Sequence, residues 1–429
     1  MQKDRSIFHI DINHCYAQIE EMMFPKLRDV PMAVGGHEEK RHGIILTKND
    51  KAKKFGIKTG ESLREALEKC PDLLIIPPHY SDYQYYTGLV KNIYKEYTDH
   101  VESFGMDEAW LDYTDSERLF GDPVKTAKEI QQRIYDEIGL TVSVGVSWNK
   151  VFAKFGSDYR KPSGFTVITR DNYKDIVWPA PAEDLLYVGW ATSKKLHERG
   201  ILTIGELANY PKEHLKRYMG TAGELIHAFA NGEDYSEVSE QNFQPPAKSV
   251  GNSMTMVHDV GSLEDIRPVF YVLSEAVASR ARDLHMEGDV VSVSMRTSGM
   301  DWFGAQVKIS QRTSVSTDIM DAAMYIVSRY DFSVPLRAAG VTLSGLKPEL
   351  SYRKLNLFID EETHDKDRLA DIAMDEIRER YGFYSVRRAC TLLDRPLTEF
   401  DVKADHTVHP VGYFQGRSFS EAFGYNKKG

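Results

Sequence analysis

Up to residue 178 the chain alternates between short apolar runs and amphipathic stretches, which is the pattern of a mixed α/β domain. The run SIFHIDI, residues 6–12, predicts a buried strand that ends in the acid Asp11. HCYAQIEEMM predicts a helix directly after it, with Asn13 as its N-cap. Further helices are expected over 61–70, 80–99 and 124–138, and strands at LLII and TVSVGVS. Asp11 therefore lies where a strand gives way to a helix, a common position for site residues.

A pair of acids interrupts the segment ESFGMDEAWLDYT, residues 102–114. Asp107 and Glu108 stand side by side between apolar residues in what otherwise reads as a half-buried strand. Adjacent like charges resist removal from water, so a positive group is expected to compensate them. A hairpin tip that leaves both acids in water is the other interpretation. Brought together with Asp11 in one sheet, the two acids would form an oxygen-ligand site for hard divalent cations.

The texture of the chain changes past residue 178. YVGWATSKKLHERGILTIGELANY predicts two short helices around a tight turn, the form of a helix-hairpin-helix, which offers backbone amides to phosphates without reading bases. Tyr187 stands where the first glycine of such a turn is usual, and Gly189 remains. A small helical bundle without a ligand is the alternative.

A polar, proline-containing linker, EQNFQPPA, precedes a separate α/β unit. Its strand VVSVSMR, residues 290–296, places apolar residues on one face and Ser292, Ser294 and Arg296 on the other, and the next strand adds Lys308 to the polar face. The first helix of this unit has one apolar face, and a second helix, near 317–330, is expected to cover the apolar face of the sheet. The apolar positions of the first helix are Ile266, Phe270, Leu273, Val277, Ala281 and Leu284. The polar face is either solvated or binds a nucleic-acid backbone. From residue 350 the chain is charged, with one more helical stretch and a polar tail.

The bulk composition changes this picture little. A chain of 429 residues is too long for one core, so roughly two to four domains are expected. The net charge of −10 argues against a protein coated in basic surface, although local basic faces exist. Three scattered cysteines indicate neither a disulfide framework nor a zinc site, and no apolar run resembles a membrane span or a signal peptide. A cytoplasmic protein without membrane attachment is expected.

Five segments, taken in order, resemble the Y-family translesion DNA polymerases, the group that contains bacterial DNA polymerases IV and V. The resemblance runs from about residue 5 to about residue 350. The segments are DINHCYAQIEE for the first metal motif, RHGIILTKNDKAKKFGIKTG for the fingers, SFGMDEAWLD for the acidic hairpin with one extra residue before the acidic pair, TVSVGVSWNKVFAKFGSDYRKPSGFTVI for the last palm motif, and the helix-hairpin-helix with KSVGNSMT for the thumb and little finger.

The resemblance implies a multidomain α/β (α+β) fold shaped as a right hand. The expected domains are the palm at 1–14 and 79–178, fingers at 15–78, thumb at 179–240, linker at 241–248, little finger at 249–349 and a C-terminal extension at 350–429. It also implies template-directed addition of dNTPs to a primer end, with low fidelity. No separate acidic cluster resembles an exonuclease, so no proofreading is expected. A palm-type nucleotide cyclase and a catalytically silent DNA-binding accessory are the rival interpretations.

The resemblance assigns roles to the residues around the acids. Asp11, Asp107 and Glu108 are expected to hold two Mg²⁺ ions, for which Mn²⁺ can substitute, with the backbone carbonyl of Ile12 as a further ligand. Tyr16 is expected to be the steric gate, an aromatic ring that leaves no room for a ribose 2′-hydroxyl.

The expected triphosphate contacts depart from the family pattern in the fingers. Thr47 is expected to donate a hydroxyl to the triphosphate, and Lys161 to stabilise charge on the leaving pyrophosphate. Asp50 and Lys53 stand where the family usually has a tyrosine and an arginine. Lys53 supplies a charge without the two-pronged fork, and Asp50 would repel a triphosphate, so nucleotide affinity is weaker or neighbouring lysines take part. Cys15 stands where the family often has an aromatic residue.

DNA contacts are expected at the thumb turn and on the polar face of the little finger. The residues are Gly189, Lys194, Lys195, Arg296 and Lys308. The protein is expected to act as a monomer.

A further peptide, YRKLNLFID at residues 352–360, resembles the Q-L-x-L-F peptide with which such bacterial polymerases bind the sliding clamp. Leu355, Leu357 and Phe358 match it, whereas Lys354 occupies the glutamine position. A short edge strand is the competing interpretation.

Overall fold

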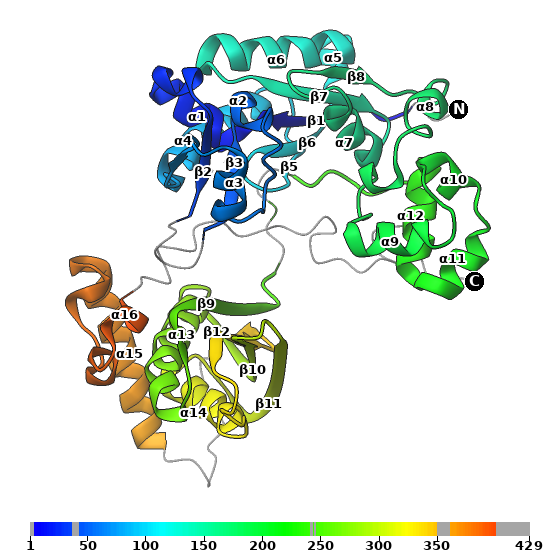
Figure 1. Cartoon of the computed structure of the whole chain (residues 1–429). Coiled ribbons are helices and arrows are strands. Elements are labelled where there is room, and N and C mark those ends of the chain that lie inside the picture. The colour runs from blue at the N-terminus through cyan, green and yellow to red at the C-terminus, as the bar shows by residue number, and fades with distance from the viewer. Residues whose placement is uncertain (1–3, 37–42, 241–242, 244–245, 350–360, 400–429) are drawn as a thin grey trace. The chain divides into compact units, whose positions relative to one another are not determined.

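The structure is a computed structural model that describes residues 4–36, 43–240, 243, 246–349 and 361–399 (Figure 1). The chain divides into two compact units, one within residues 1–245 and one that begins at Pro246. Each unit has a hydrophobic core of its own, and each is described here by itself.

The first unit is built on a five-stranded sheet with the order β5-β6-β1-β7-β8. Its central strand, β1 (Ile7–Ile12), is buried along its whole length, as its apolar sequence predicts, and pairs antiparallel with β6 and β7. The other strands are β5 (Val101–Ser103), β6 (Glu108–Asp112), β7 (Val142–Ser147) and β8 (Phe165–Val167).

Helices cover both faces of this sheet. Phe8 and Ile10 share a core with residues of the helices at 15–23, 80–95 and 123–138, whereas Ile7 packs in the core around Phe152. The helices of this part are α1 (Cys15–Met23), α4 (Tyr80–Lys95), α5 (Glu117–Phe120), α6 (Pro123–Ile138), α7 (Lys150–Tyr159) and α8 (Tyr173–Ile176).

Helix α7 lies unusually close to β7. A Cβ added at Gly145 would lie 1.9 Å from the carbonyl oxygen of Ala153, so only glycine fits there. The side chain of Asn149 caps α7 by accepting from the backbone N–H of Phe152. This close packing fixes the height of the α7 side chains over the central strands.

The start of α1 differs from the sequence-based expectation. The N-cap is His14, in the left-handed region with φ 35°, and it makes no side-chain cap bond. Asn13, the expected cap, instead donates to the hydroxyl of Thr141 and accepts from the hydroxyl of Ser143. The prediction of the cap was wrong because a tertiary partner outcompeted the local bond.

A small sheet with the order β3-β2-β4 follows α1 in the chain. Its strands are β2 (Met32–Gly35), β3 (Ile45–Lys48) and β4 (Leu74–Ile76), and its helical turns are η1 (Pro25–Asp29), α2 (Asp50–Lys53) and α3 (Leu63–Lys69). Ser62 and Glu65 form a capping box that starts α3.

A helical bundle completes the first unit. It comprises η3 (Ala182–Asp184), α9 (Trp190–His197), α10 (Ile204–Asn209), α11 (Lys212–Met219) and α12 (Thr221–Ala230). The chain after α12 returns to the large sheet, where the backbone N–H of Ser239 donates to Glu102 at 3.0 Å. Glu102 is buried and forms an ion pair of 2.6 Å with the buried Lys150.

The second unit is a four-stranded antiparallel sheet with the order β11-β10-β12-β9. The strands are β9 (Ser249–Val260), β10 (Met286–Thr297), β11 (Trp302–Thr313) and β12 (Leu336–Ser344), and the two-residue β13 (Lys347–Pro348) pairs with β10. Val291, Val293 and Met295 lie in the core under α13 (Leu263–Asp283) and α14 (Ser316–Val327), which confirms the alternation read from the sequence.

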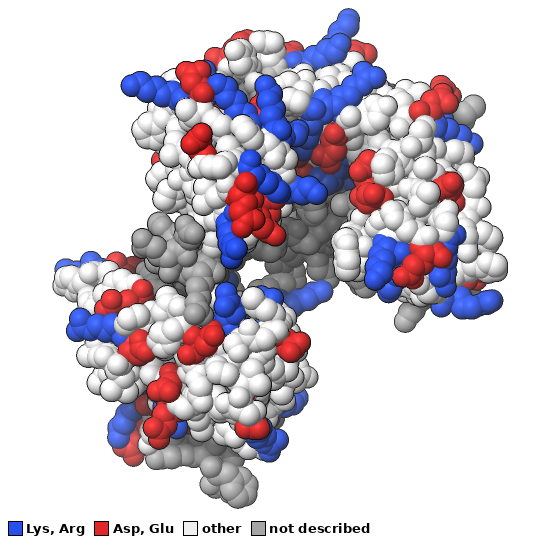
Figure 2. Space-filling model, in the orientation of Figure 1, with Lys and Arg blue, Asp and Glu red and all other residues white. Residues whose placement is uncertain are grey.

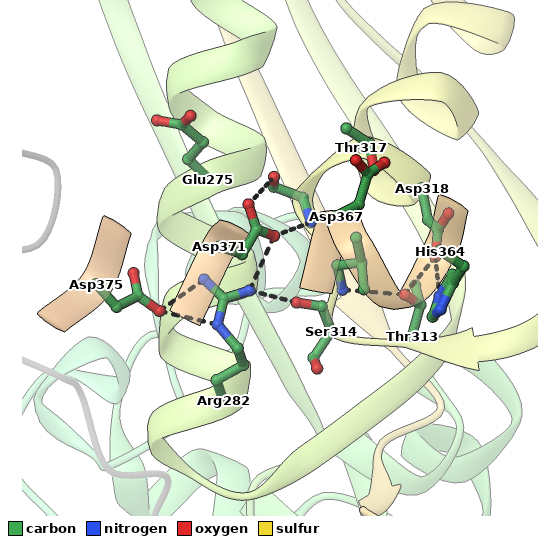
Figure 3. Close-up of polar contacts among 12 residues, drawn as sticks. Glu275, Arg282, Thr313, Ser314, Thr317, Asp318, His364, Asp367, Asp371 and Asp375 are labelled. Carbon is green, nitrogen blue, oxygen red and sulfur yellow. Dashed lines mark hydrogen bonds and ion pairs between the residues drawn. The ribbon is translucent and has the colours of Figure 1, made fainter. Parts of the chain in front are cut away.

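The charged segment after residue 360 forms a third layer. It comprises α15 (Glu361–Tyr381), η4 (Phe383–Ser385), η5 (Ala389–Leu392) and α16 (Arg395–Thr398). Helix α15 packs against α13 and α14 through polar contacts (Figure 3). Asp371, which is 3% exposed, accepts from the backbone N–H and the hydroxyl of Ser316 and pairs with Arg282.

Across the described ranges, no helix is both long enough and apolar enough to cross a membrane.

Candidate active site

The three predicted acids lie at one end of the central strand pair. Asp11 is the direct cross-strand partner of Glu108 in the β1–β6 ladder. Asp107 immediately precedes β6, and its carbonyl accepts from the backbone N–H of Ile12 at 3.0 Å. Side chains directly opposite each other in an antiparallel pair share a face, so Asp11 and Glu108 point the same way, toward α7. The two hairpin acids are therefore half-buried at one end of the sheet rather than at a tip surrounded by water.

The acids are costly to ionise where they are. Burial raises the pKa of Asp11 to about 6, with Glu108 adding to the rise and Lys161 opposing it. Burial also raises the pKa of Asp107 to about 6, and the charges of Asp11 and Glu108 add to that rise. The mutual effect shows that the three carboxylates lie within electrostatic reach of one another. Their negative charge is only partly compensated.

Two lysines provide the compensation that exists. Lys161 Nζ lies 2.7 Å from Asp11 Oδ2 and 2.7 Å from Asp158 Oδ1. Lys154 Nζ forms an ion pair with Glu108 and lies 3.8 Å from Asp158 Oδ2. Burial alone would lower the pKa of Lys161, but Asp11 and Asp158 raise it, so the ammonium stays charged. Asp158 thus contacts both lysines, and the lysines in turn contact Asp11 and Glu108 on the neighbouring strands β1 and β6.

A histidine lies beneath this network. His9 Nδ1 lies 2.7 Å from the Ser157 hydroxyl, and His9 Nε2 lies 3.2 Å from Glu108 Oε2 without hydrogen-bond alignment. Burial and the charge of Lys154 hold the pKa of His9 well below its usual value, so the ring is neutral.

The donor set fits a hard divalent cation in its chemistry. Within the described part of the chain, no three His, Cys, Asp or Glu side chains converge closely enough to hold a metal ion as they stand. Asp11 and Glu108 are instead turned to ammonium groups. Buried carboxylates with raised pKa values still favour a positive charge, and oxygen ligands suit Mg²⁺ or Mn²⁺. Cation binding here requires the carboxylates to exchange lysine contacts for the ion.

Tyr16 lies in the first turn of α1, within electrostatic reach of Asp107. Its ring stacks on Tyr83 of α4 with centroids 4.5 Å apart and an interplanar angle of 11°. Tyr80 meets both rings edge-on, at 6.0 Å from each. Tyr16 itself is half-buried.

The predicted triphosphate contacts come from two separate places. Lys161 is at the acids, whereas Thr47 is a half-buried residue of β3 and Lys53 an exposed residue of α2. Lys53 and Asp50 both act electrostatically on the half-buried His14, whose pKa is lowered mainly by burial. Lys53 is therefore near the start of α1, but among the described residues no contact joins Lys53 to Asp11 or Lys161.

The predicted DNA contacts lie in both units. Gly189 is the N-cap of α9, and Tyr187 adopts the left-handed φ of 71° that glycine favours, so the turn keeps its form without the first glycine. Lys194 and Lys195 lie on α9.

In the second unit, Arg296 stacks over the exposed Trp302 at 5.5 Å, and Lys308 lies 3.3 Å from Asp289. On the face shown in Figure 2, basic and acidic side chains are interspersed over each unit, so positive charge is local rather than continuous. The predicted clamp peptide, with Leu355, Leu357 and Phe358, lies outside the described residues.

Sequence reasoning missed His9, Lys154 and Asp158. Lys154 and Asp158 lie four residues apart on α7, and Lys161 follows three residues later, just past the end of the helix; this spacing was the available signal for one charged face. The sequence did not show that this face meets Asp11 and Glu108, because those contacts join residues 150 and 46 positions apart.

Comparison with known proteins identifies the family. Sequence models of three families match the chain: the impB/mucB/samB family at residues 10–158, its C-terminal domain at 247–357, and a DNA polymerase-iota thumb domain at 183–234. A solved Y-family DNA polymerase chimera superimposes with a TM-score of 0.68, covering 80% of this chain and 100% of its own at 22% identity. At that identity the likeness shows the fold, a Y-family polymerase fold.

Several proteins of known name have a higher sequence identity to this chain than the solved chimera has. A protein named DNA polymerase IV from Acetivibrio thermocellus is 44% identical over 394 residues, which is 92% of this chain and 99% of that protein. DNA polymerase IV of Clostridium acetobutylicum is 34% identical over 90% of this chain and 98% of its own length, and DNA polymerase IV 2 of Bacillus subtilis is 35% identical over 91% and 96%. The chain therefore belongs to the Y-family of DNA polymerases, which confirms the resemblance seen in its motifs.

Proposed function

We propose that the chain is a template-directed DNA polymerase of the translesion class, which adds dNTPs to a primer 3′ end and releases pyrophosphate. The observation that carries the proposal is the cross-strand pair of Asp11 and Glu108 beside Asp107, in a buried place where two of the acids have raised pKa values. Relatives named DNA polymerase IV, matched over nine-tenths of the chain, support the activity. Family membership brings with it primer-template DNA, dNTPs and dependence on a divalent metal.

The three acids would hold the metal, proposed as two Mg²⁺ ions. Asp11 and Asp107 would be shared ligands, with the carbonyl of Ile12 beside them, and Glu108 would serve the ion at the primer end. When bound, such a pair of ions activates the 3′-hydroxyl and neutralises the triphosphate. The protein's own part is to keep the carboxylates buried, close together and short of positive charge.

The nucleotide would be held by residues around this pair. Lys161 carries a secure positive charge and would bind the phosphates, while Thr47 and Lys53 would contact them from the fingers. Tyr16 would pack under the sugar, where its ring excludes a 2′-hydroxyl. Lysine in place of the usual arginine gives a point charge, which is consistent with a loose grip on the triphosphate.

DNA would be bound through its backbone. The N-terminus of α9 at Gly189, with Lys194 and Lys195, would take phosphates, and the polar face of the second sheet, with Arg296 and Lys308, would take the duplex. These contacts are independent of sequence, as a polymerase requires.

The decisive test is extension of a labelled primer past a defined template lesion, with wild type and Asp107→Ala compared under Mg²⁺. A polymerase extends in the wild type only, and the product depends on the template. A nucleotide cyclase would consume one nucleotide without a primer, and a silent accessory would bind DNA without extending it. Either result would overturn the proposal.

Docking to a sliding clamp is proposed for residues 352–360. Truncation before Leu355 is a poor test, because it also removes α15 to α16, which cover α13. The better variant replaces Leu355, Leu357 and Phe358 together with alanine. Loss of clamp-stimulated synthesis with unchanged basal synthesis is expected, and equal loss of both would contradict it. We further propose that the enzyme acts as a cytoplasmic monomer.

A further inference from the structure

A buried carboxylate lies directly behind the proposed steric gate. Glu20 follows Tyr16 by four residues on α1, so the two side chains lie on the same side of the helix, one turn apart. Glu20 is 0% exposed. Neither the metal site nor the proposed nucleotide contacts use it.

One tyrosine contacts both residues. The ring of Tyr83 stacks on Tyr16 at 4.5 Å, and its hydroxyl donates to Glu20 Oε1 at 2.5 Å. His79 Nδ1 lies 2.8 Å from the same carboxylate oxygen. Tyr83 belongs to α4, is itself 0% exposed and contacts α1 through both Tyr16 and Glu20, so its ring is restrained at the face and at the hydroxyl. The plane of Tyr16 is therefore set by a ring that is anchored at its far end.

The anchor is energetically unfavourable on its own. Among the described residues, Glu20 Oε2 has no hydrogen-bond partner, although it is fully buried. A buried carboxylate with one unsatisfied oxygen destabilises a fold, and glutamine or an apolar residue would be expected if packing alone decided. A strong, charge-assisted acceptor is useful where a hydroxyl must be held in one place.

We propose that Glu20, acting through Tyr83 with help from His79, is a positioning residue for sugar selection: it fixes the plane of Tyr16 and so sets how strongly a 2′-hydroxyl is excluded. A gate works only if its ring cannot tilt away from the incoming sugar, because small displacements of a positioned group change discrimination strongly. Without the hydroxyl anchor Tyr83 can shift within its stack, and Tyr16 can follow. The inference rests on the proposed function, because it requires Tyr16 to be the gate.

The test measures kcat/KM for a dNTP and for the matching rNTP in full-length Tyr83→Phe and Glu20→Gln. Tyr83→Phe keeps the stacked ring and removes only the donor. We expect relative rNTP use to rise about tenfold, the factor that corresponds to loss of one charge-assisted hydrogen bond, with dNTP use little changed. A merely structural role would lower kcat/KM equally for the dNTP and the rNTP and would leave the ratio of the two values unchanged.

The chain offers a matched control in Tyr94→Phe. Tyr94 is also a buried tyrosine of α4, but its hydroxyl has no hydrogen-bond partner among the described residues. Its variant should keep the wild-type ratio. Tyr16→Ala distinguishes the role of Tyr16 as the gate from the role of Glu20 and Tyr83 in positioning it. If Tyr16→Ala admits rNTPs while Tyr83→Phe and Glu20→Gln keep the wild-type ratio, the anchor is wrong and the gate stands. If Tyr16→Ala also keeps that ratio, both are overturned, whereas absence of dNTP incorporation in the wild type overturns the proposed function itself.

Discussion

Two groups of buried carboxylates are treated in opposite ways by this fold. In the second unit, Asp371 forms an ion pair of 3.2 Å with Arg282 (Figure 3). It also accepts two hydrogen bonds of 2.7 Å from Ser316 and forms an ion pair of 3.1 Å with Arg388. In the first unit, Asp11 has one ammonium partner and a pKa of about 6. A carboxylate that holds the fold together is surrounded by donors, whereas one proposed for catalysis retains unmet charge.

The type of cation differs as well. Glu275 and Asp371 are both contacted by the guanidinium of Arg388, which bridges them with a planar fork. Asp11 and Glu108 are contacted by Lys161 and Lys154, point charges on flexible stems. Guanidinium forks suit a permanent contact between α13 and α15. Ammonium groups can leave a carboxylate at lower cost, as exchange for a metal ion requires.

The largest expected effect separates function from stability. Asp107→Asn should lower the rate of primer extension on the order of a thousandfold or more, because a metal ligand contributes several kcal/mol to the transition state. The free energy of unfolding at pH 7 should be unchanged or higher, since a repelling charge is removed. Single-turnover extension and chemical denaturation measure the two quantities. A variant that unfolds more easily and keeps its rate would reverse the roles of the two clusters.

Asp371→Ala should do the opposite. Removing Asp371 leaves Arg282 paired only with Asp375 and Arg388 paired only with Glu275, and the Ser316 donors lose their buried acceptor. The free energy of unfolding of the second unit should fall by about 3–5 kcal/mol, as for a broken buried ion pair. Extension by the folded protein at low temperature should match wild type. Asp365→Ala, at an exposed position of the same helix, is the control and should change neither quantity. Equal effects of the two substitutions would mean that the buried contacts do not hold α15.

The raised pKa values make a prediction for pH. Because the folded protein holds protons on Asp11 and Asp107 up to about pH 6, whereas the usual value is 3.8, ionisation costs stability as pH rises through this window. The cost is absent well below pH 3.8 and complete well above pH 6, and a shift of this size corresponds to about 3 kcal/mol for each carboxyl taken singly.

Denaturation of metal-free protein between pH 4 and pH 7 measures this cost. Asp107→Asn should gain stability relative to wild type as pH rises, and Mg²⁺ should reverse that gain. If the free energies of unfolding of wild type and Asp107→Asn differ by the same amount at every pH, the raised pKa values of the acids are contradicted.

The smallest expected effect compares the two cations. Arg388→Lys keeps the charge but can no longer contact Glu275, Asp371 and the Ser316 hydroxyl together. A loss of about 1 kcal/mol is expected, roughly one hydrogen bond. Lys154→Arg is its counterpart in the first unit, and little change in the free energy of unfolding is expected. Thermal unfolding resolves both, and a larger loss for Lys154→Arg would remove the distinction between fixed and exchangeable partners.

Much of the fold follows from periodicity alone. The buried strand ending at Asp11, the alternation along β10 and the apolar face of α13 were all predicted, because each depends on spacing within one element. The pairing of Asp11 with the hairpin acids came from the family resemblance, since sequence spacing does not reveal which strands are neighbours. The roles assigned to Tyr16, Thr47 and the DNA-contacting lysines stay predictions.

Polar contacts between residues far apart in the sequence could not be predicted from the sequence. Val272 and Ala276 form a small buried cluster on α13 apart from the main core, and the segment after residue 360 packs on this helix. That segment is rich in charge and was read simply as a charged extension with one helix. Its charges are paired across a helix interface, as Asp371 shows, and no local pattern distinguishes a paired charge from a solvated one.

The layer formed by α15 has a mechanical consequence. Residues 350–360 are joined on one side to β13, which pairs with β10, and on the other to α15, which is fixed on α13 and α14. A partner that grips the intervening peptide pulls on two attachment points of one domain instead of a free end. If the partner is the proposed sliding clamp, a force on the peptide would act directly on the domain that is proposed to bind the duplex. Binding to the clamp and binding to DNA would then be mechanically coupled.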